Sequence, residues 1–172
     1  MPFLALADTE TVDGITWTYT VRDGKARVEV DGSSAIPSST TGSITIPSML
    51  GGCPVTSVGN YAFHGCNGLM SVMIPSSVTR IGRYAFSGCS GLKSVTIPSS
   101  VIRIGANAFF GCSSLSVVCV DGGDVKQMSS LLKAASVNCD TVKVVELVSP
   151  ADPGVEPVVT NAIPSGKPRS GL

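Results

Sequence analysis

Residues 71–93 read SVMIPSSVTRIGRYAFSGCSGLK and residues 94–116 read SVTIPSSVIRIGANAFFGCSSLS, so that 16 of the 23 positions are identical. A period of 23 residues is too short for a two-helix repeat or a propeller blade, and it suits a unit of one strand and one return segment. Such a unit cannot bury its apolar face alone and must pack against its neighbours. The repetition therefore predicts a solenoid.

An earlier unit fits the same frame. Residues 43–70 read SITIPSMLGGCPVTSVGNYAFHGCNGLM and match once a short bulge is allowed around Leu50 to Pro54. The shared columns include Ile46, Ile74 and Ile97; Gly59, Gly82 and Gly105; Phe63, Phe86 and Phe109; Cys66, Cys89 and Cys112; and Leu69, Leu92 and Leu115. We expect a repeat array over residues 43–120, made of units 43–70, 71–93 and 94–116 and the strand that follows.

The apolar positions of each unit predict one short strand. Where the second unit meets the third, Leu92, Val95 and Ile97 have the spacing L-x-x-L-x-L, whose final two members alternate as inward residues of a strand do. The intervening Met73, Thr96 and Cys119 of successive units should point outward. The phenylalanine column should form the opposite inner wall, with the column of glycines at a sharp corner that a side chain would obstruct.

At this level of detail the chain resembles the BspA-like, or treponemal, type of leucine-rich repeat, whose units read much like IPSSVTRIGRYAFSGCSGLKSVT. The Ile-Pro, Ile-Gly, Ala-Phe, Gly-Cys and Leu columns all stand in register with that pattern over about residues 43–120. The resemblance implies a strand-rich α/β fold, a short right-handed leucine-rich-repeat solenoid. It also implies a bacterial surface-exposed or secreted protein used for adhesion and for contact with protein or glycan.

Both flanks of the array predict caps. Residues 14–31 alternate apolar and polar residues on both sides of Asp23-Gly24, which indicates a β-hairpin within an N-terminal cap and connection at residues 11–42. Trp17 is either a binding aromatic or part of the capping core, and the second interpretation is favoured. Residues 121–148 are expected to form a β-α-β C-terminal cap together with the preceding strand, with Asp124 capping a helix over residues 125–135.

The two ends of the sequence predict little packed structure. Residues 1–10, MPFLALADTE, contain an A-x-A pattern and are either a remnant of a signal peptide or an ordinary leader. Residues 149–172 contain five prolines and are expected to form a disordered tail.

The cysteines favour buried thiols over a metal site. Cys66, Cys89 and Cys112 occupy one repeat column and are expected to stack in the reduced state as small apolar residues. Because the chain has no C-x-x-C motif and only one histidine, we predict no metal site. Cys119 and Cys139 flank the expected helix, and the sequence leaves open whether they form a disulfide.

Composition excludes several classes of function. The chain has 172 residues, is 43% hydrophobic and carries a formal net charge of +0, which suits one buried core and argues against a nucleic-acid partner. No apolar stretch approaches the ~20 residues of a membrane span, so no membrane insertion is expected.

The single histidine, His64, has no catalytic partner, and the sequence lacks the nucleophile-elbow and phosphate-binding glycine motifs. We therefore predict no enzyme activity and no cofactor.

Two surfaces are candidates for binding. The first, called the strand face below, consists of outward-facing residues around the strands: Ser43, Thr45, Met70, Ser71, Met73, Lys93, Ser94, Thr96 and Cys119. Its hydroxyl groups could exchange hydrogen bonds with a glycan or an extended peptide, and its methionines offer adaptable apolar contact. The second is a basic edge formed by Arg80 and Arg103, with Arg83 nearby, suited to carboxylates or sulfates. In both cases a simple solvated surface is the alternative.

The sequence therefore predicts a non-enzymatic adhesion or binding module, extracellular or on the cell surface, that recognises protein or glycan through the strand face. The tentative ligand-binding residues are Ser71, Met73, Lys93, Ser94, Thr96, Arg80 and Arg103. The alternative is a structural spacer or self-assembly element that associates with copies of itself.

Overall fold

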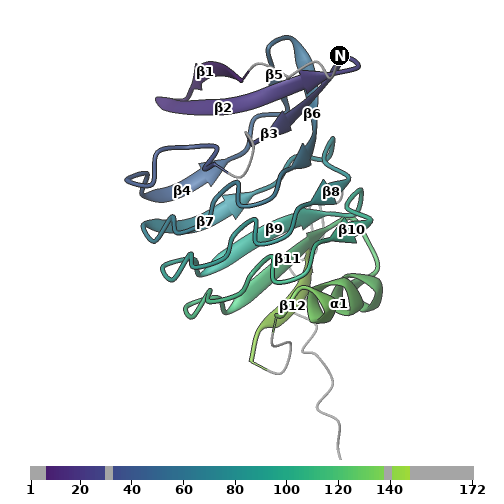
Figure 1. Cartoon of the computed structure of the whole chain (residues 1–172). Coiled ribbons are helices and arrows are strands. Elements are labelled where there is room, and N and C mark those ends of the chain that lie inside the picture. The colour runs from purple at the N-terminus through teal and green to yellow at the C-terminus, as the bar shows by residue number, and fades with distance from the viewer. Residues whose placement is uncertain (1–6, 30–32, 138–140, 148–172) are drawn as a thin grey trace, which may run out of the picture.

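The computed structural model describes residues 7–29, 33–137 and 141–147 and consists of two stacked sheets and one helix (Figure 1). In each repeat the chain passes from one sheet to the other and back, so that successive repeats lie side by side. The predicted strand-rich solenoid is confirmed. Residues 1–6, Cys139 and the tail expected at 149–172 lie outside the described residues.

The first sheet is parallel and has five strands in the order β12-β11-β9-β7-β4. Its strands are β4 (Gly42–Thr45), β7 (Leu69–Met73), β9 (Ser94–Pro98), β11 (Val117–Asp121) and β12 (Lys143–Leu147). The inward residues pair across the sheet in one register, and all of them are buried: Ile44, Val72, Val95, Val118 and Val144. The predicted alternation of inward and outward residues is therefore confirmed.

The second sheet carries the return segments and the N-terminal strands. Its order is β1-β2-β3-β6-β8-β10, with β5 paired to β6. These strands are β1 (Asp8–Val12), β2 (Ile15–Arg22), β3 (Lys25–Val28), β5 (Met49–Leu50), β6 (Cys53–Val58), β8 (Arg80–Ile81) and β10 (Arg103–Ile104). The expected hairpin is present as β2 and β3. Residues 8–10, which the sequence places in a possible leader, lie in β1, which pairs antiparallel with β2.

A column of aromatic rings fills the space between the sheets. Phe63 stacks on Phe86 with ring centroids 4.9 Å apart, and Phe86 stacks on Phe109 at 5.2 Å. Trp17 meets Phe63 edge to face at 6.1 Å, and it is only 1% exposed. Trp17 thus extends the aromatic column from β2 into the repeats, which confirms its interpretation as core.

The glycine column allows the repeats to approach closely. A Cβ atom on Gly82 would lie 2.5 Å from the backbone of Gly59, and one on Gly105 would lie 2.5 Å from the backbone of Arg83. Neither contact can be relieved by turning a side chain, since the opposing atoms belong to the backbone. The predicted corner at which a side chain would be obstructed is therefore confirmed.

The five extra residues of the first unit form a hairpin rather than an irregular bulge. β5 and β6 pair antiparallel around Gly51 and Gly52, which both have positive φ angles. The amide of Gly51 donates a hydrogen bond to Glu10 Oε2 at 2.7 Å. The hairpin lengthens β6 to six residues, and this longer strand pairs in parallel with β3. The insertion thus joins the repeats to the N-terminal strands.

The chain after the last repeat forms a parallel βαβ unit. Helix α1 (Val125–Ala134) connects β11 to β12, and these two strands pair in parallel. Asp124 precedes the helix, and its Oδ1 accepts a hydrogen bond from the amide of Lys126 at 2.8 Å. Met128 and Leu132 are buried on the inner side of the helix.

The cysteine column forms a ladder of thiols beside the phenylalanines. Cys89 Sγ donates to the carbonyl of Phe63 at 3.0 Å, and Cys112 Sγ donates to the carbonyl of Phe86 at 3.1 Å. Burial raises the pKa of Cys89 to about 12 and that of Cys112 to about 11. These thiols are free, as predicted. They pack as small apolar residues, and each S–H group donates a hydrogen bond to a carbonyl of the preceding repeat.

Replacing Phe86 by alanine should lower the free energy of unfolding by about 3–5 kcal/mol, because Phe86 is fully buried and stacks on rings at both sides. Phe110→Ala is the matched control: this ring is 60% exposed, so its loss should change stability by less than about 0.5 kcal/mol. Urea unfolding of the three proteins measures both. Equal effects of the two substitutions would contradict the stacked core.

The thiol ladder should also make stability depend on alkaline pH. The folded chain holds these protons up to a pKa of about 12 at Cys89, whereas the unfolded chain releases them above about 9. The contribution of these thiols to stability should therefore be constant below about pH 8 and fall between about pH 9 and pH 12. Cys89→Ala should flatten this fall, whereas Val95→Ala, at a buried position without a titratable group, should not. Urea midpoints across this range, under reducing conditions, provide the measurement, and an unchanged slope in Cys89→Ala would refute the explanation.

Candidate binding surfaces

The strand face is an array of outward-facing rows on the five-stranded sheet. One row passes through Thr45, Met73, Thr96 and Cys119 to Val145, and a second passes through Ser43, Ser71, Ser94 and Val117 to Lys143. Neighbouring strands lie ~4.8 Å apart, so each row spans roughly 19 Å. The side chains follow one another at this spacing because each repeat places the same position at the same point of the sheet.

The chemistry of the strand face is mostly neutral. Hydroxyl groups alternate with two thioethers that are well exposed, Met70 at 48% and Met73 at 50%. Ser71, Ser94 and Thr96 are half-buried between their neighbours. Lys93 is exposed one residue before β9, and its amide donates to the carbonyl of Met70 at 2.8 Å. Such a surface offers hydrogen bonds and adaptable apolar contact with little charge.

The two predicted arginines lie on the other sheet. Arg80 is in β8 and Arg103 is in β10, where they pair directly across the parallel ladder. The tentative ligand-binding residues therefore divide into two sets: Ser71, Met73, Lys93, Ser94 and Thr96 belong to the strand face, whereas Arg80 and Arg103 are in the second sheet. The structure does not bring them into one site.

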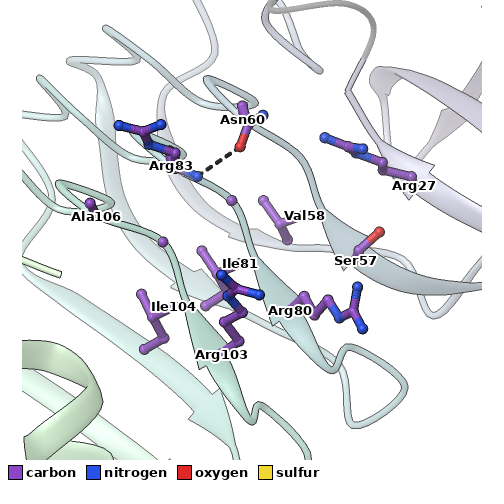
Figure 2. A pocket seen from close by; sticks show the side chains of 12 residues that line it. Arg27, Ser57, Val58, Asn60, Arg80, Ile81, Arg83, Arg103, Ile104 and Ala106 are labelled. Atoms are coloured by element: carbon purple, nitrogen blue, oxygen red, sulfur yellow. Dashed lines mark hydrogen bonds between the residues drawn. The ribbon is translucent and has the colours of Figure 1, made fainter. Parts of the chain in front are cut away.

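A hollow of about 560 Å³ opens over this part of the second sheet (Figure 2). Four arginines take part in its lining: Arg27, Arg80, Arg83 and Arg103. The amide of Arg83 donates to Asn60 Oδ1 at 2.8 Å, which fixes the corner that follows β8. Arg27 was not predicted to lie here, because its place beside the repeats depends on the parallel pairing of β3 with β6. The alternation of residues 14–31 revealed a hairpin but not its partner in the array.

Among the residues that the structure describes, little supports a metal site or a catalytic site. No group of three or more His, Cys, Asp or Glu side chains there could hold a metal ion. His64 is exposed and packs edge to face on Tyr61 with centroids 5.8 Å apart. Cys119 is free, and its possible partner Cys139 is outside the described residues.

In the described part of the chain, no helix has the length and apolar character required to cross a bilayer.

Solved structures of bacterial leucine-rich repeat proteins are similar to this fold. A leucine-rich repeat protein of T. pallidum superposes with a TM-score of 0.54 at 24% identity, over 76% of this chain and 61% of that protein. A leucine-rich cell surface protein of Faecalibacterium prausnitzii A2-165 gives 0.51 at 30% identity, over 66% of this chain and 32% of that one. A leucine-rich repeat protein of Bacteroides capillosus ATCC 29799 gives 0.50 at 30% identity, over 64% and 80%. The chain thus spans less than two thirds of the first two proteins.

The sequence comparisons agree with the structural ones. None of the curated proteins compared with the chain matches it. A family model described as a BspA type leucine rich repeat region (6 copies) matches residues 33–149. This match extends beyond the three units recognised in the sequence and includes the segment before β4 and the βαβ unit after the last repeat. With its repeat columns, its two stacked sheets and this match over most of its length, the chain belongs to the BspA-type leucine-rich repeat family.

Proposed function

We propose that this chain is a non-enzymatic binding or adhesion module that works on the surface of a bacterial cell or outside it. It recognises a protein or a glycan through the strand face. The observation that carries the proposal is the pair of in-register outward rows on five adjacent strands. Membership of a repeat family whose relatives include a leucine-rich cell surface protein supports the setting.

The composition of the strand face supports a macromolecular partner. A continuous parallel sheet presents a rigid surface, and a ligand that crosses several strands meets equivalent positions at a constant interval. Hydroxyl groups suit hydrogen bonding to sugars or to a peptide backbone. Met70 and Met73 are half exposed next to them and can adapt their shape to an apolar partner.

A non-enzymatic role is supported by the lack of convergent catalytic groups in the described residues. The single histidine of the chain, His64, is exposed, and it packs on the ring of Tyr61 rather than beside a nucleophile or a carboxylate. General acid-base catalysis needs a positioned group within hydrogen-bond reach of its proton. Among the described residues, the His64 imidazole has no hydrogen bond that would position it for this task.

The second candidate function is self-assembly, and one observation favours it. β12 pairs only with β11 among the described strands, and β4 pairs only with β7, so each end of the five-stranded sheet has an edge. Unpaired edge strands can add a strand from another chain. Leu147 in β12 is 40% exposed, which adds an apolar contact at that edge.

The variant Met73→Glu/Thr96→Glu tests the strand face, since it adds two charges to one outward row and leaves the buried residues unchanged. Wild-type and variant chains are immobilised, and capture is measured for a panel of purified extracellular proteins and uncharged glycans. We expect the variant to lose at least about tenfold in affinity for the captured ligand, because the added carboxylates would have to be desolvated in the interface.

The matched control removes charge from the other sheet: Arg80→Gln/Arg103→Gln should keep this capture within about twofold. Sedimentation of the wild-type chain at rising concentration is measured in parallel. If the chain captures only copies of itself, and the variant self-associates as well as wild type does, the strand-face proposal is contradicted and self-assembly is favoured.

A further inference from the structure

The neutral net charge of the chain conceals a cationic repeat array. Residues 33–120 contain no aspartate and no glutamate, and their only charged side chains are Arg80, Arg83, Lys93 and Arg103. The array therefore carries a formal charge of +4, while the acidic residues stand before and after it. Three of the four cations line the hollow on the second sheet. A local positive potential exists there despite the overall balance.

The register of the second sheet arranges these charges in a line. Arg27 pairs with Ser57, Ser57 with Arg80, and Arg80 with Arg103, across the adjacent parallel strands β3, β6, β8 and β10. We call this line the arginine row (Figure 2). The next position on each strand is the buried row Val28, Val58, Ile81 and Ile104, so the arginine row faces outward. At ~4.8 Å per strand it extends over about 14 Å.

The positive charges of the row are poorly compensated. Arg27 forms an ion pair with Glu29 at 2.6 Å, and this is the one ion pair found among the residues that the structure describes. Arg80 and Arg103 have no such partner there, although they are direct cross-strand neighbours, an arrangement that destabilises a sheet. The lining of the hollow includes no acidic residue. An anionic ligand would relieve this repulsion.

We infer that the arginine row is a binding site for a linear acidic polysaccharide, one that carries sulfate or carboxylate groups along its chain. Each guanidinium group presents a planar fork of donors that matches a carboxylate or sulfate with two parallel hydrogen bonds. The regular spacing of the row suits a polymer with repeated charges, and Ser57 places a hydroxyl group between the arginines for a sugar hydroxyl. This inference does not depend on the strand face.

The backbone around the row argues against an acidic peptide as the occupant. The amides of Gly59, Gly82 and Gly105 already donate to the carbonyls of Val28, Val58 and Ile81 at 2.8–2.9 Å. β6 and β8 are interior strands, paired on both sides. A peptide therefore could not add a strand beside β6 or β8, and β10, the last strand of the order, has α1 against it. An acidic peptide would have to bind the row through its side chains. A polysaccharide needs no backbone ladder, because its recognition rests on its charged groups and hydroxyls.

The test is the binding of heparin, as a sulfated and carboxylated probe, to the full chain by calorimetry at low and at physiological salt. Hyaluronan supplies carboxylates alone, dextran supplies no charge, and poly-L-glutamate supplies an acidic peptide. We expect heparin, hyaluronan or both to bind, with affinity falling as salt rises, and dextran not to bind. Arg80→Gln/Arg103→Gln should weaken this binding by at least about tenfold.

The matched control is Lys126→Gln/Lys133→Gln, which removes the same charge from exposed positions on α1 and should bind within about twofold of wild type. Arg80→Lys/Arg103→Lys keeps the charge but loses the fork, and its affinity should lie between those of wild type and the glutamine variant. The site is overturned if neither polysaccharide binds, if the control loses as much as the arginine variant, or if poly-L-glutamate binds as tightly as the polysaccharides. Met73→Glu/Thr96→Glu should bind the polysaccharide as wild type does. This result would show that polysaccharide binding is independent of the strand face, so the two proposals are tested separately.

Discussion

The fold depends on one constraint: each repeat must bury its apolar residues against the next repeat, at the distance set by hydrogen bonding between parallel strands. Backbone pairing places equivalent residues ~4.8 Å apart, and the Phe63–Phe86 and Phe86–Phe109 rings stack at 4.9 and 5.2 Å. The side-chain column and the backbone ladder therefore have nearly the same period. The glycine column satisfies this constraint at the corner, where the backbones of successive repeats would leave no room for a Cβ atom.

The same constraint explains the structure at both ends. A column that ends in water would expose its last ring, so the N-terminal strands supply Trp17 as a further member that packs edge to face on Phe63. At the other end the chain adds β12 in parallel to β11 through α1, which buries Met128 and Leu132. The hairpin of the first repeat lengthens β6 so that it can pair with β3. The insertion is a structural adaptation to the first position of the array.

Much of this architecture could be predicted because the apolar spacing, which is a weak signal within one unit, recurs at equivalent positions of successive units. The strands of the first sheet, the buried phenylalanines and the helix after Asp124 follow from apolar spacing and capping. β1 escaped prediction, since its five residues, DTETV, are mostly exposed and carry no apolar alternation. The pairing of β3 with β6 also escaped, because no local signal specifies a contact between strands 30 residues apart. Arg27 could not be assigned to a site without that contact, whereas Arg80 and Arg103 share a column and were recognised.

Repetition also explains why both candidate surfaces are rows. In a solenoid, an outward residue at one position of the unit reappears one strand away, so that a single choice of side chain is multiplied along the surface. On the strand face the multiplied groups are hydroxyls, and on the second sheet they are guanidinium groups. The affinity of such a surface comes from the number and spacing of equivalent side chains rather than from a deep pocket. It therefore favours extended ligands that contact several repeats at once. The absence of acidic side chains from residues 33–120 preserves the charge of the arginine row, since one glutamate in an outward column would neutralise an adjacent guanidinium.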